Sequence, residues 1–366
     1  MKYDYLIVGA GWAGATIGNL LTEQGKKCLV VDKRECIGGL ASTEIQDDIV
    51  VHRYGPHIFH TSSRMIWDYV NRFAEFNPIH YSVKSCSCYQ GGIYSLPINL
   101  LTLFQVFGAT SIERAKAAVA QDCIPTDNPQ NMEEWCLANV GRTLYSMFIE
   151  GYTTKQWGVH PIFLPASIVR RLPIRYTFND SWFNDADIYV GIPKYGYTPM
   201  FAKMLEGCTV ELGIDFTQHP ALAHETNRII CTMPLDRFCN CELGPLSYRS
   251  LMFEHEWMDK PAHQGTPVLN YTGLDVDYTR IIEHKFFDPY CKNTTTTLVT
   301  KEYPSSVGEP MYVLPDEYMK SLAMSYKTLL RKRGIYTLGR FGTYEYLDQD
   351  KVVQQAMDLL RELANG

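Results

Sequence analysis

Three histidines stand close together in the stretch HRYGPHIFHT, as His52, His57 and His60. Imidazoles at this spacing could bind a metal ion or move a proton, because histidine titrates near neutral pH. A zinc site needs a third and a fourth ligand, and the neighbouring sequence offers no cysteine or carboxylate at zinc-like spacing. The Cys-x-Cys pairs that begin at Cys86 and Cys239 also lack the usual two-residue spacer. We therefore expect no metal, and the histidines need another explanation.

A glycine-rich turn precedes the histidines. The segment YLIVGAGWAGATIGNLL begins with a continuous apolar run, as in a strand buried on both faces, and then places Gly9, Gly11 and Gly14 in a G-x-G-x-x-G pattern. These glycines permit a tight turn, a close approach of the backbone to a pyrophosphate, and close packing of helix on strand. Asp32 ends the second expected strand, where a carboxylate binds ribose hydroxyls. The pattern predicts a dinucleotide at a helix N-terminus.

The residues after Asp32 favour FAD over NAD. The stretch KRECIGGLAS contains Gly38 and Gly39, a second close backbone approach that suits a flavin running deep into the protein. Near the C-terminus, YTLGRFGTYEYLDQDKVVQQAMDLLREL predicts a strand, a short loop and an amphipathic helix. Such a helix can present its N-terminus to the flavin or to its ribityl chain. Asp348 suits either a flavin contact or a plain helix N-cap, and the sequence leaves both open.

Bulk properties exclude several classes of function. The 366 residues carry a net charge of −6, which favours neither nucleic acid nor an anionic membrane as a partner. The eleven cysteines lack a disulfide-framework spacing, and the first expected strand begins almost at residue 1, so we expect a cytoplasmic chain without a signal peptide. The longest apolar stretch, Leu96 to Ala109, is too short and too polar to span a bilayer.

Many motifs, in the same order, resemble those of the bacterial UDP-galactopyranose mutases. They run from residue 3 to about residue 360 and include GAGWAG, HRYGPHIFHT, EGYTTKQWG, LPASIVRRLPIRYTF, YTRIIEHK, TKEYP and GRFGTYEY. The resemblance implies an α/β fold, in which a discontinuous Rossmann-like FAD-binding domain carries an inserted helical domain and an antiparallel β-sheet domain. The expected bounds are 1–76, 190–236 and 318–366 for the FAD-binding domain, 96–165 for the helical domain, and 77–95, 166–189 and 237–317 for the sheet and substrate domain.

The resemblance also implies an activity. Such enzymes are isomerases that interconvert UDP-galactopyranose and UDP-galactofuranose for cell-surface polysaccharides, with reduced FAD and an external reductant, as homodimers. The flavin N5 attacks the anomeric carbon, and a flavin–sugar adduct opens and recloses before the diphosphate returns. Other hypotheses stay open: a pyranose–furanose mutase for another donor, such as UDP-GalNAc or a deoxyhexose donor, an FAD oxidoreductase, or a silent nucleotide-sugar binder.

The motifs and the resemblance together assign the site residues. The expected cofactor-binding residues are Gly9, Gly11, Gly14, Asp32, Lys33, Gly38, Gly39, Leu40, His57, Ile58, Arg340 and Asp348. The expected catalytic residues are Arg171 and Arg280, as clamps on the diphosphate, with His57 and His60 against the flavin. The expected substrate-binding residues are Tyr81, Phe148, Ile149, Tyr152, Thr153, Trp157, Arg171, Trp182, Phe183, Arg249, Asn270, Arg280, Tyr312 and Tyr346. For the two histidines we favour positioning of the flavin over proton transfer.

Arg171 lies in a stretch that resembles the family's mobile lid, residues 164–173, and is favoured over its neighbour Arg170. Three positions depart from the family pattern: Tyr81 replaces an asparagine, while Trp182 and Met311 each replace a tyrosine. All three changes fall on the substrate side. We therefore expect recognition of the diphosphate and the pyrimidine, and the sequence leaves the sugar open.

Overall fold

The computed structural model describes residues 2–87, 92–170, 174–314 and 316–365. The chain forms two compact units, each assembled from separate segments. The first unit comprises residues 1–78, 186–248 and 310–366, and the second comprises 79–185 and 249–309.

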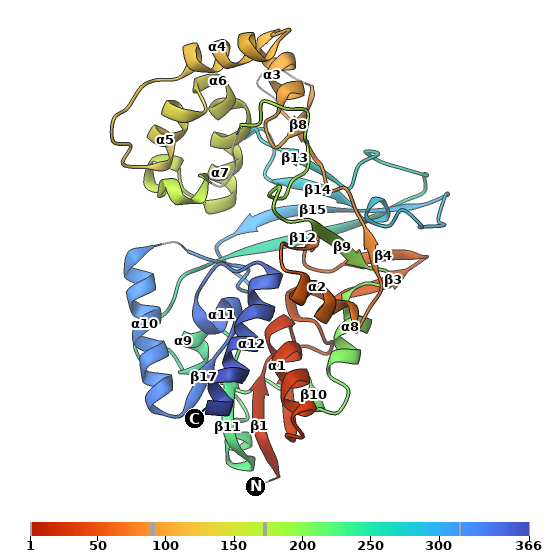
Figure 1. Ribbon diagram of the computed structural model, residues 1–366, viewed down its shortest axis with the longest axis vertical. Coiled ribbons are helices and arrows are strands. Elements are labelled where there is room, and N and C mark those ends of the chain that lie inside the picture. The colour runs from red at the N-terminus through yellow and green to blue at the C-terminus, as the bar shows by residue number, and fades with distance from the viewer. Residues whose placement is uncertain (1, 88–91, 171–173, 315, 366) are drawn as a thin grey trace. The chain divides into compact units, whose positions relative to one another are not determined.

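A five-stranded parallel sheet is the centre of the first unit. Its order is β10-β2-β1-β11-β17, formed by β10 (Thr209–Leu212), β2 (Cys28–Asp32), β1 (Tyr3–Val8), β11 (Thr226–Cys231) and β17 (Ile335–Thr337). In the register, Leu6 lies opposite Leu29 on one side and Ile229 on the other. Such strands are buried on both faces, which explains the apolar runs that predicted β1 and β2. The helices α1 (Trp12–Glu23) and α12 (Gln349–Asn365) pack against each other, side by side in Figure 1.

Smaller elements of the first unit carry the histidine stretch. The stretch begins at the last residue of the hairpin of β3 (Thr43–Gln46) and β4 (Ile49–His52). It ends in the first strand of a three-stranded sheet, in the order β5 (Phe59–Thr61), β9 (Tyr189–Pro193) and β6 (Phe76–Pro78). The remaining helices are α2 (Arg64–Asn71), α8 (Tyr197–Met204), α9 (Leu235–Phe238), α10 (Glu317–Lys332) and α11 (Gly339–Thr343), with the short strand β16 (Tyr312–Val313).

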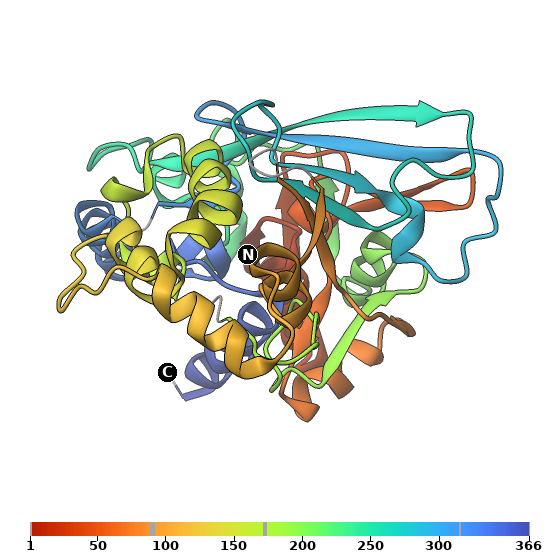
Figure 2. The same ribbon diagram turned by 90° about the horizontal axis from the view of Figure 1, so that it is seen from above.

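The second unit contains an antiparallel sheet with one parallel pair, β13 and β7. The order within the unit is β12 (Tyr248–Met258), β15 (Thr297–Ser305), β14 (Arg280–Glu283), β13 (Val268–Tyr271), β7 (Val83–Cys86) and β8 (Ile93–Leu96). The long strands β12 and β15 run alongside each other in Figure 2. This sheet places Arg280 of β14 directly opposite Glu302 of β15.

A group of helices completes the second unit. They are α3 (Leu100–Phe107), α4 (Ile112–Asp122), α5 (Met132–Asn139), α6 (Arg142–Leu144), a π-helix at Tyr145–Ile149 and α7 (Glu150–Trp157). The side chains of Asn99, Ser111 and Asn131 cap the N-termini of the first three helices by accepting backbone amides. Asparagine and serine are among the preferred residues at this position. A single π-helical turn is frequent at functional sites, and this one leads directly into α7.

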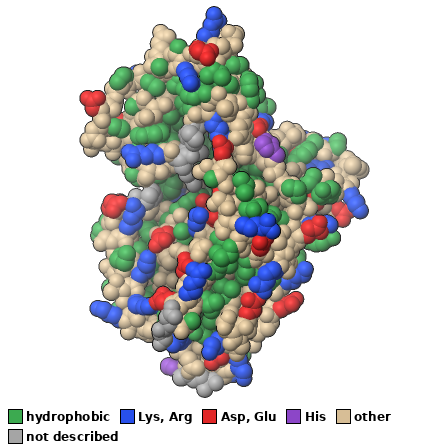
Figure 3. Space-filling view, in the orientation of Figure 1, with side chains coloured by type: hydrophobic (Ala, Val, Ile, Leu, Met, Phe, Trp, Pro, Cys, Tyr) green, Lys and Arg blue, Asp and Glu red, His purple; other side chains and the backbone are tan. Residues whose placement is uncertain are grey.

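Charged groups on the surface are mixed in sign. On the face of the first unit visible in Figure 3, basic and acidic side chains are interspersed. None of the described helices combines the length and the apolar composition that crossing a bilayer requires.

Candidate active site

The first glycine turn leaves no room for side chains. Gly9 has a positive φ of 117°, which L-residues rarely adopt, and a β-carbon there would collide with the hydroxyl of Thr232. A β-carbon on Gly14 would collide with the carbonyl oxygen of Gly9, because α1 packs directly on the turn. Thr232, which follows β11 and binds the carbonyl of Val8 at 2.8 Å, was not predicted from the sequence. The turn keeps the bare backbone that a pyrophosphate needs.

The second glycine turn lies against the first. The amide of Gly38 donates to the carbonyl of Ala10 at 2.9 Å, and a β-carbon on Gly39 would lie 3.2 Å from the α-carbon of Gly11. The two stretches of bare backbone expected from the sequence to approach the dinucleotide therefore lie against each other in the fold. Beside them, the buried hydroxyl of Ser42 has no hydrogen-bond partner among the described residues. A cradle of bare backbone with a buried polar atom at its edge fits a dinucleotide.

Asp32 stands at the carboxyl end of β2, beside this cradle. Its Oδ2 accepts the amide of Ala10 at 2.8 Å and its Oδ1 accepts the amide of Arg34 at 2.9 Å. These bonds fix the carboxylate, and each oxygen retains acceptor capacity for a ribose hydroxyl. The structure thus holds Asp32 where the sequence pattern places a ribose ligand.

The remaining expected cofactor residues are spread over the first unit. Lys33 is exposed after Asp32, and Leu40 is half-buried in the short helix at Gly39–Ala41. Ile58 is buried just before β5. Asp348 immediately precedes α12, and its carbonyl accepts the amide of Val352 at 3.2 Å. This position is that of the N-cap of the closing helix, one of the two roles that the sequence left open.

His57 is held as a neutral ring. Its Nδ1 lies 2.9 Å from the carbonyl oxygen of Gly55. Because a carbonyl can only accept, Nδ1 carries the proton. Burial and, second, the positive charge of Arg340 lower the pKa of His57 to about 4, although the bond to Gly55 opposes part of this shift. At neutral pH the ring therefore has an unprotonated Nε2, which can accept a hydrogen bond.

The C-terminal segment brings Arg340 to His57 together with two phenols. The guanidinium of Arg340 donates to the carbonyls of Met311 at 3.2 Å and of Leu347 at 2.9 Å, and it lies 4.8 Å from the ring centre of Tyr346. The rings of Tyr346 and Tyr312 are nearly parallel, with centres 6.3 Å apart. Met311, a departure from the family pattern, thus contributes its backbone carbonyl, and its side chain is buried.

His60 has a different partner from His57. Its Nδ1 lies 2.9 Å from Oδ2 of Asp187, and both side chains are half-buried. Asp187 was not anticipated from the sequence, because it is far along the chain and reaches β5 only through the pairing of β5 with β9. Among the described residues, no group of three or more histidine, cysteine or acidic side chains is placed to hold a metal.

The second unit gathers several of the expected substrate residues around Arg280. Nη2 of Arg280 donates to the hydroxyl of Tyr152 on α7 at 2.7 Å, and its Nε lies 3.2 Å from Oε1 of Glu302. Tyr81 is buried, with its ring 5.7 Å from that of Phe183 and 6.2 Å from that of Phe287. Burial raises the pKa of the Tyr81 phenol, and the positive charge of Arg280 opposes part of this rise. One cation, two phenols and one carboxylate therefore form a cluster.

Other cations hold α7 in place. Lys155 donates from Nζ to the carbonyls of Tyr271, Val276 and Tyr278, at 2.9, 3.1 and 2.8 Å. Arg249, which is buried, donates from Nε to the carbonyl of Gln156 at 3.0 Å and from Nη2 to that of Lys155 at 3.3 Å. A cation at the last carbonyls of a helix is favoured by the helix dipole. The sequence did not predict this bond between Arg249 and the end of α7.

The other expected substrate residues surround α7 and the neighbouring strands. Phe148, Ile149 and Thr153 are buried, and Trp157 is half-buried. Asn270 lies opposite Arg280 across β13 and β14, and its buried Oδ1 has no partner among the described residues. The amide of Trp182 donates to the carbonyl of Tyr81 at 2.8 Å. Arg171, with the last part of the expected lid, lies outside the described residues.

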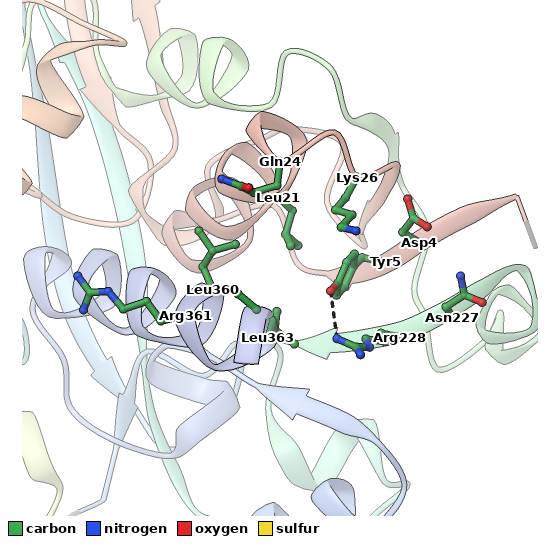
Figure 4. Close-up of a pocket in the computed structure, with 11 residues that line it drawn as sticks. Asp4, Tyr5, Leu21, Gln24, Lys26, Asn227, Arg228, Leu360, Arg361 and Leu363 are labelled. Carbon is green, nitrogen blue, oxygen red and sulfur yellow. Dashed lines mark hydrogen bonds between the residues drawn. The ribbon is translucent and has the colours of Figure 1, made fainter. Parts of the chain in front are cut away.

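A pocket of about 590 Å³ in the first unit lies away from these residues. Figure 4 shows it beside the amino ends of β1 and β11, where Arg228 donates to the hydroxyl of Tyr5 at 3.4 Å. Ligands of parallel sheets bind outside the carboxyl ends of the strands, where the glycine turns lie. This pocket is therefore not the dinucleotide site.

The parallel sheet, the paired glycine turns and Asp32 define a Rossmann-like dinucleotide-binding protein, and the family model of NAD(P)-binding Rossmann-like domains matches residues 7–73. The family model of UDP-galactopyranose mutase matches residues 147–346. A probable UDP-galactopyranose mutase of Klebsiella pneumoniae is 38% identical, over 99% of this chain and 95% of its own length. The chain belongs to the UDP-galactopyranose mutase family, a family of isomerases.

Two further similarities are informative. A dTDP-fucopyranose mutase of Escherichia coli is 36% identical, over 96% of both chains. The crystal structure of a reduced UDP-galactopyranose mutase has the same fold, with a TM-score of 0.76 at 15% identity, over 100% of this chain and 96% of the other. The expected family, fold class and class of enzyme are thereby confirmed.

Proposed function

We propose that this protein interconverts the pyranose and furanose forms of a nucleoside-diphosphate hexose, with UDP-galactose as the substrate and reduced FAD as the cofactor. The observation that carries the proposal is the cluster around Arg280, in which a cation held between Tyr152 and Glu302 stands beside an aromatic wall. A cation for a diphosphate and a ring for a base are what such a substrate needs, in a chain that also has a dinucleotide cradle.

The paired glycine turns, Asp32, His57 and Arg340 would hold FAD. When bound and reduced, FAD would supply a nucleophile for displacement of the nucleoside diphosphate at the anomeric carbon. Negative charge grows on the diphosphate as it leaves, and fixed cations stabilise that charge most when they need no rearrangement. Arg280 has this role, together with Arg171 on sequence grounds.

Aromatic side chains complete substrate binding. The ring of Tyr152 stacks on the pyrimidine, an interaction worth roughly 1–3 kcal/mol per base in nucleic-acid complexes. The phenols of Tyr312 and Tyr346 donate to phosphate oxygens. His57, neutral and with an unprotonated Nε2, positions the flavin by accepting a hydrogen bond. His60 has its orientation fixed by Asp187.

A second candidate is a mutase for a deoxyhexose donor. The E. coli dTDP-fucopyranose mutase is nearly as similar to this chain as the K. pneumoniae relative. Tyr81, where the family pattern has an asparagine, forms an aromatic wall with Phe183 and Phe287. Such a wall suits a methyl group better than a hydroxymethyl group, because it offers few hydrogen-bond partners.

We further propose the organisation that the resemblance implies: a discontinuous FAD-binding domain with separate helical and sheet domains, in a cytoplasmic homodimer supplied with electrons by an external reductant.

The test is a panel of donors offered to dithionite-reduced protein: UDP-galactose, UDP-GalNAc and dTDP-fucose. Products are separated by chromatography and examined for furanose, with oxidised protein as the control. Furanose from UDP-galactose only with reduced protein supports the proposal, and furanose from dTDP-fucose alone supports the second candidate. Turnover by oxidised protein with release of peroxide would instead identify an oxidase, and no conversion of any donor would reject a mutase for these donors.

A further inference from the structure

Glu302 is a buried carboxylate that the assignment of site residues did not include. It lies on β15, directly opposite Arg280 of β14, and only 1% of its surface is exposed. The pairing of the two strands is fixed nearby, because the amide of Thr279 donates to the carbonyl of Glu302 at 2.9 Å. The side chains of Arg280 and Glu302 therefore meet on one face of the sheet, because directly opposite residues of paired strands point to the same face.

The guanidinium has an inner and an outer edge. The side chain of Arg280 is 21% exposed and that of Glu302 is 2% exposed, so the carboxylate lies behind the cation. Nε of Arg280 lies 3.2 Å from Oε1 of Glu302 in an ion pair that lacks the alignment of a hydrogen bond, while Nη2 donates to the hydroxyl of Tyr152 at 2.7 Å. The ion pair at Nε and the hydrogen bond at Nη2 together restrict the direction of the guanidinium, because the group is planar and rigid.

We propose that Glu302 is a positioning residue, whose carboxylate holds the guanidinium of Arg280 by their ion pair so that its terminal N–H groups are directed at the diphosphate of the nucleotide sugar. This inference rests on the proposed function and deepens it.

Stability alone does not account for the pair. Burying a carboxylate costs free energy that an ion pair recovers only in part, and apolar residues of similar volume are often as good. The pair instead removes the freedom of a long cation before substrate arrives. That entropy would otherwise be lost on binding, and a misdirected donor stabilises a leaving group poorly.

Two substitutions separate orientation from charge. Glu302→Gln keeps an oxygen at the reach of Oε1 but loses the charge, and Glu302→Asp keeps the charge but shortens the reach by one methylene. If Glu302 acts by positioning, we expect Glu302→Gln to retain kcat within about threefold and Glu302→Asp to lose about tenfold or more, with a smaller effect on KM. The opposite order would assign the role to charge and overturn the proposal.

A binding cycle tests the route through Arg280. The affinity for UDP is measured by calorimetry in the wild type, Glu302→Asp, Arg280→Ala and the double variant. We expect Glu302→Asp to weaken UDP binding about fivefold in the wild-type background and to change nothing in the Arg280→Ala background. Equal weakening in both backgrounds would show that Glu302 does not act through Arg280.

Controls distinguish a positioning role from damage to the fold. Glu254, an exposed carboxylate paired with Lys301 on the same sheet, provides the matched variant Glu254→Gln, for which kcat and UDP affinity should be unchanged. Flavin content and Tm are measured for every variant. The wild-type donor panel tests the proposed function by itself. If UDP binds but no furanose forms, the proposed function fails while the cycle still decides the role of Glu302, and absence of UDP binding by the wild type overturns both.

Discussion

The neutral state of His57 leads to a pH dependence that can be measured. Its pKa is about 4 in the folded protein, lowered by burial and by the charge of Arg340, against an ordinary value near 6.5. The unfolded chain therefore binds a proton at His57 that the folded protein does not, wherever the pH lies between these values. The contribution of the neutral ring to the free energy of unfolding is fully present above about pH 6.5, and it falls as the pH decreases toward 4.

The size of the effect follows from the two pKa values. At about pH 5 the loss is about 2 kcal/mol relative to about pH 7.5, because the unfolded ring is almost fully protonated and the folded ring is not. The ring is only half-buried, so we take this figure as an upper value. Burial also lowers the pKa of His284, to about 3, so other groups contribute to the total dependence.

A substitution isolates the contribution of His57. In His57→Asn the amide nitrogen takes the place of Nδ1 and can donate to Gly55, but the side chain does not titrate. Denaturant unfolding is measured for both proteins at about pH 5 and about pH 7.5, and His284 cancels in the comparison because both contain it. We expect the variant to lose less stability on acidification than the wild type, by up to about 2 kcal/mol.

The exposed His224 provides the control variant His224→Asn, which should keep the wild-type dependence on pH. Nitrogen NMR of the imidazoles gives a direct check, with proton on Nδ1 and none on Nε2 at neutral pH. Identical pH dependence in the wild type and His57→Asn, or a proton on Nε2, would refute the assignment of a neutral ring held by Gly55.

Two further predictions concern the cofactor and the base. Gly14→Ala should yield protein with little bound flavin and lower stability, by about 1–3 kcal/mol or more, because the added methyl collides with the carbonyl of Gly9. Flavin absorbance per protein measures the first effect. Gly25→Ala is the control for flavin content: its positive φ of 74° strains an alanine and lowers stability, but no atom lies near the added methyl, so the variant should keep its flavin. Tyr152→Ala should weaken UDP binding by about tenfold or more, because the stacking ring is lost. Tyr152→Phe keeps the ring but loses the hydroxyl that accepts from Arg280, and should weaken UDP binding less. Equal affinity of Tyr152→Ala and the wild type for UDP would place the pyrimidine elsewhere.

The predictions from the sequence succeed where the determinant is local. The apolar run before Gly9 and the spacing of three glycines predict a buried strand, a tight turn and a helix, since each feature depends on neighbours in the chain. The family resemblance adds the inserted units, which no local pattern of residues contains.

Pairings between distant segments were not accessible from the sequence. Asp187 reaches His60 through the pairing of β5 with β9, and Glu302 reaches Arg280 through that of β14 with β15. Arg249 matches a substrate-binding position by sequence, and its bonds to the end of α7 are visible only in the fold. A carboxylate's partner depends on strand register, and a one-residue shift turns every side chain to the other face.

The sequence by itself therefore determined the class of this protein: a dinucleotide cradle, because glycine spacing and apolar runs act over a few residues, and a family, because many motifs recur in order. Tertiary structure decided the state of the charged groups. His57 is neutral because of burial beside Arg340, and Arg280 is held by a carboxylate more than twenty residues away in the chain. Burial and the distance between charges set protonation and orientation, and both arise only when distant segments fold together.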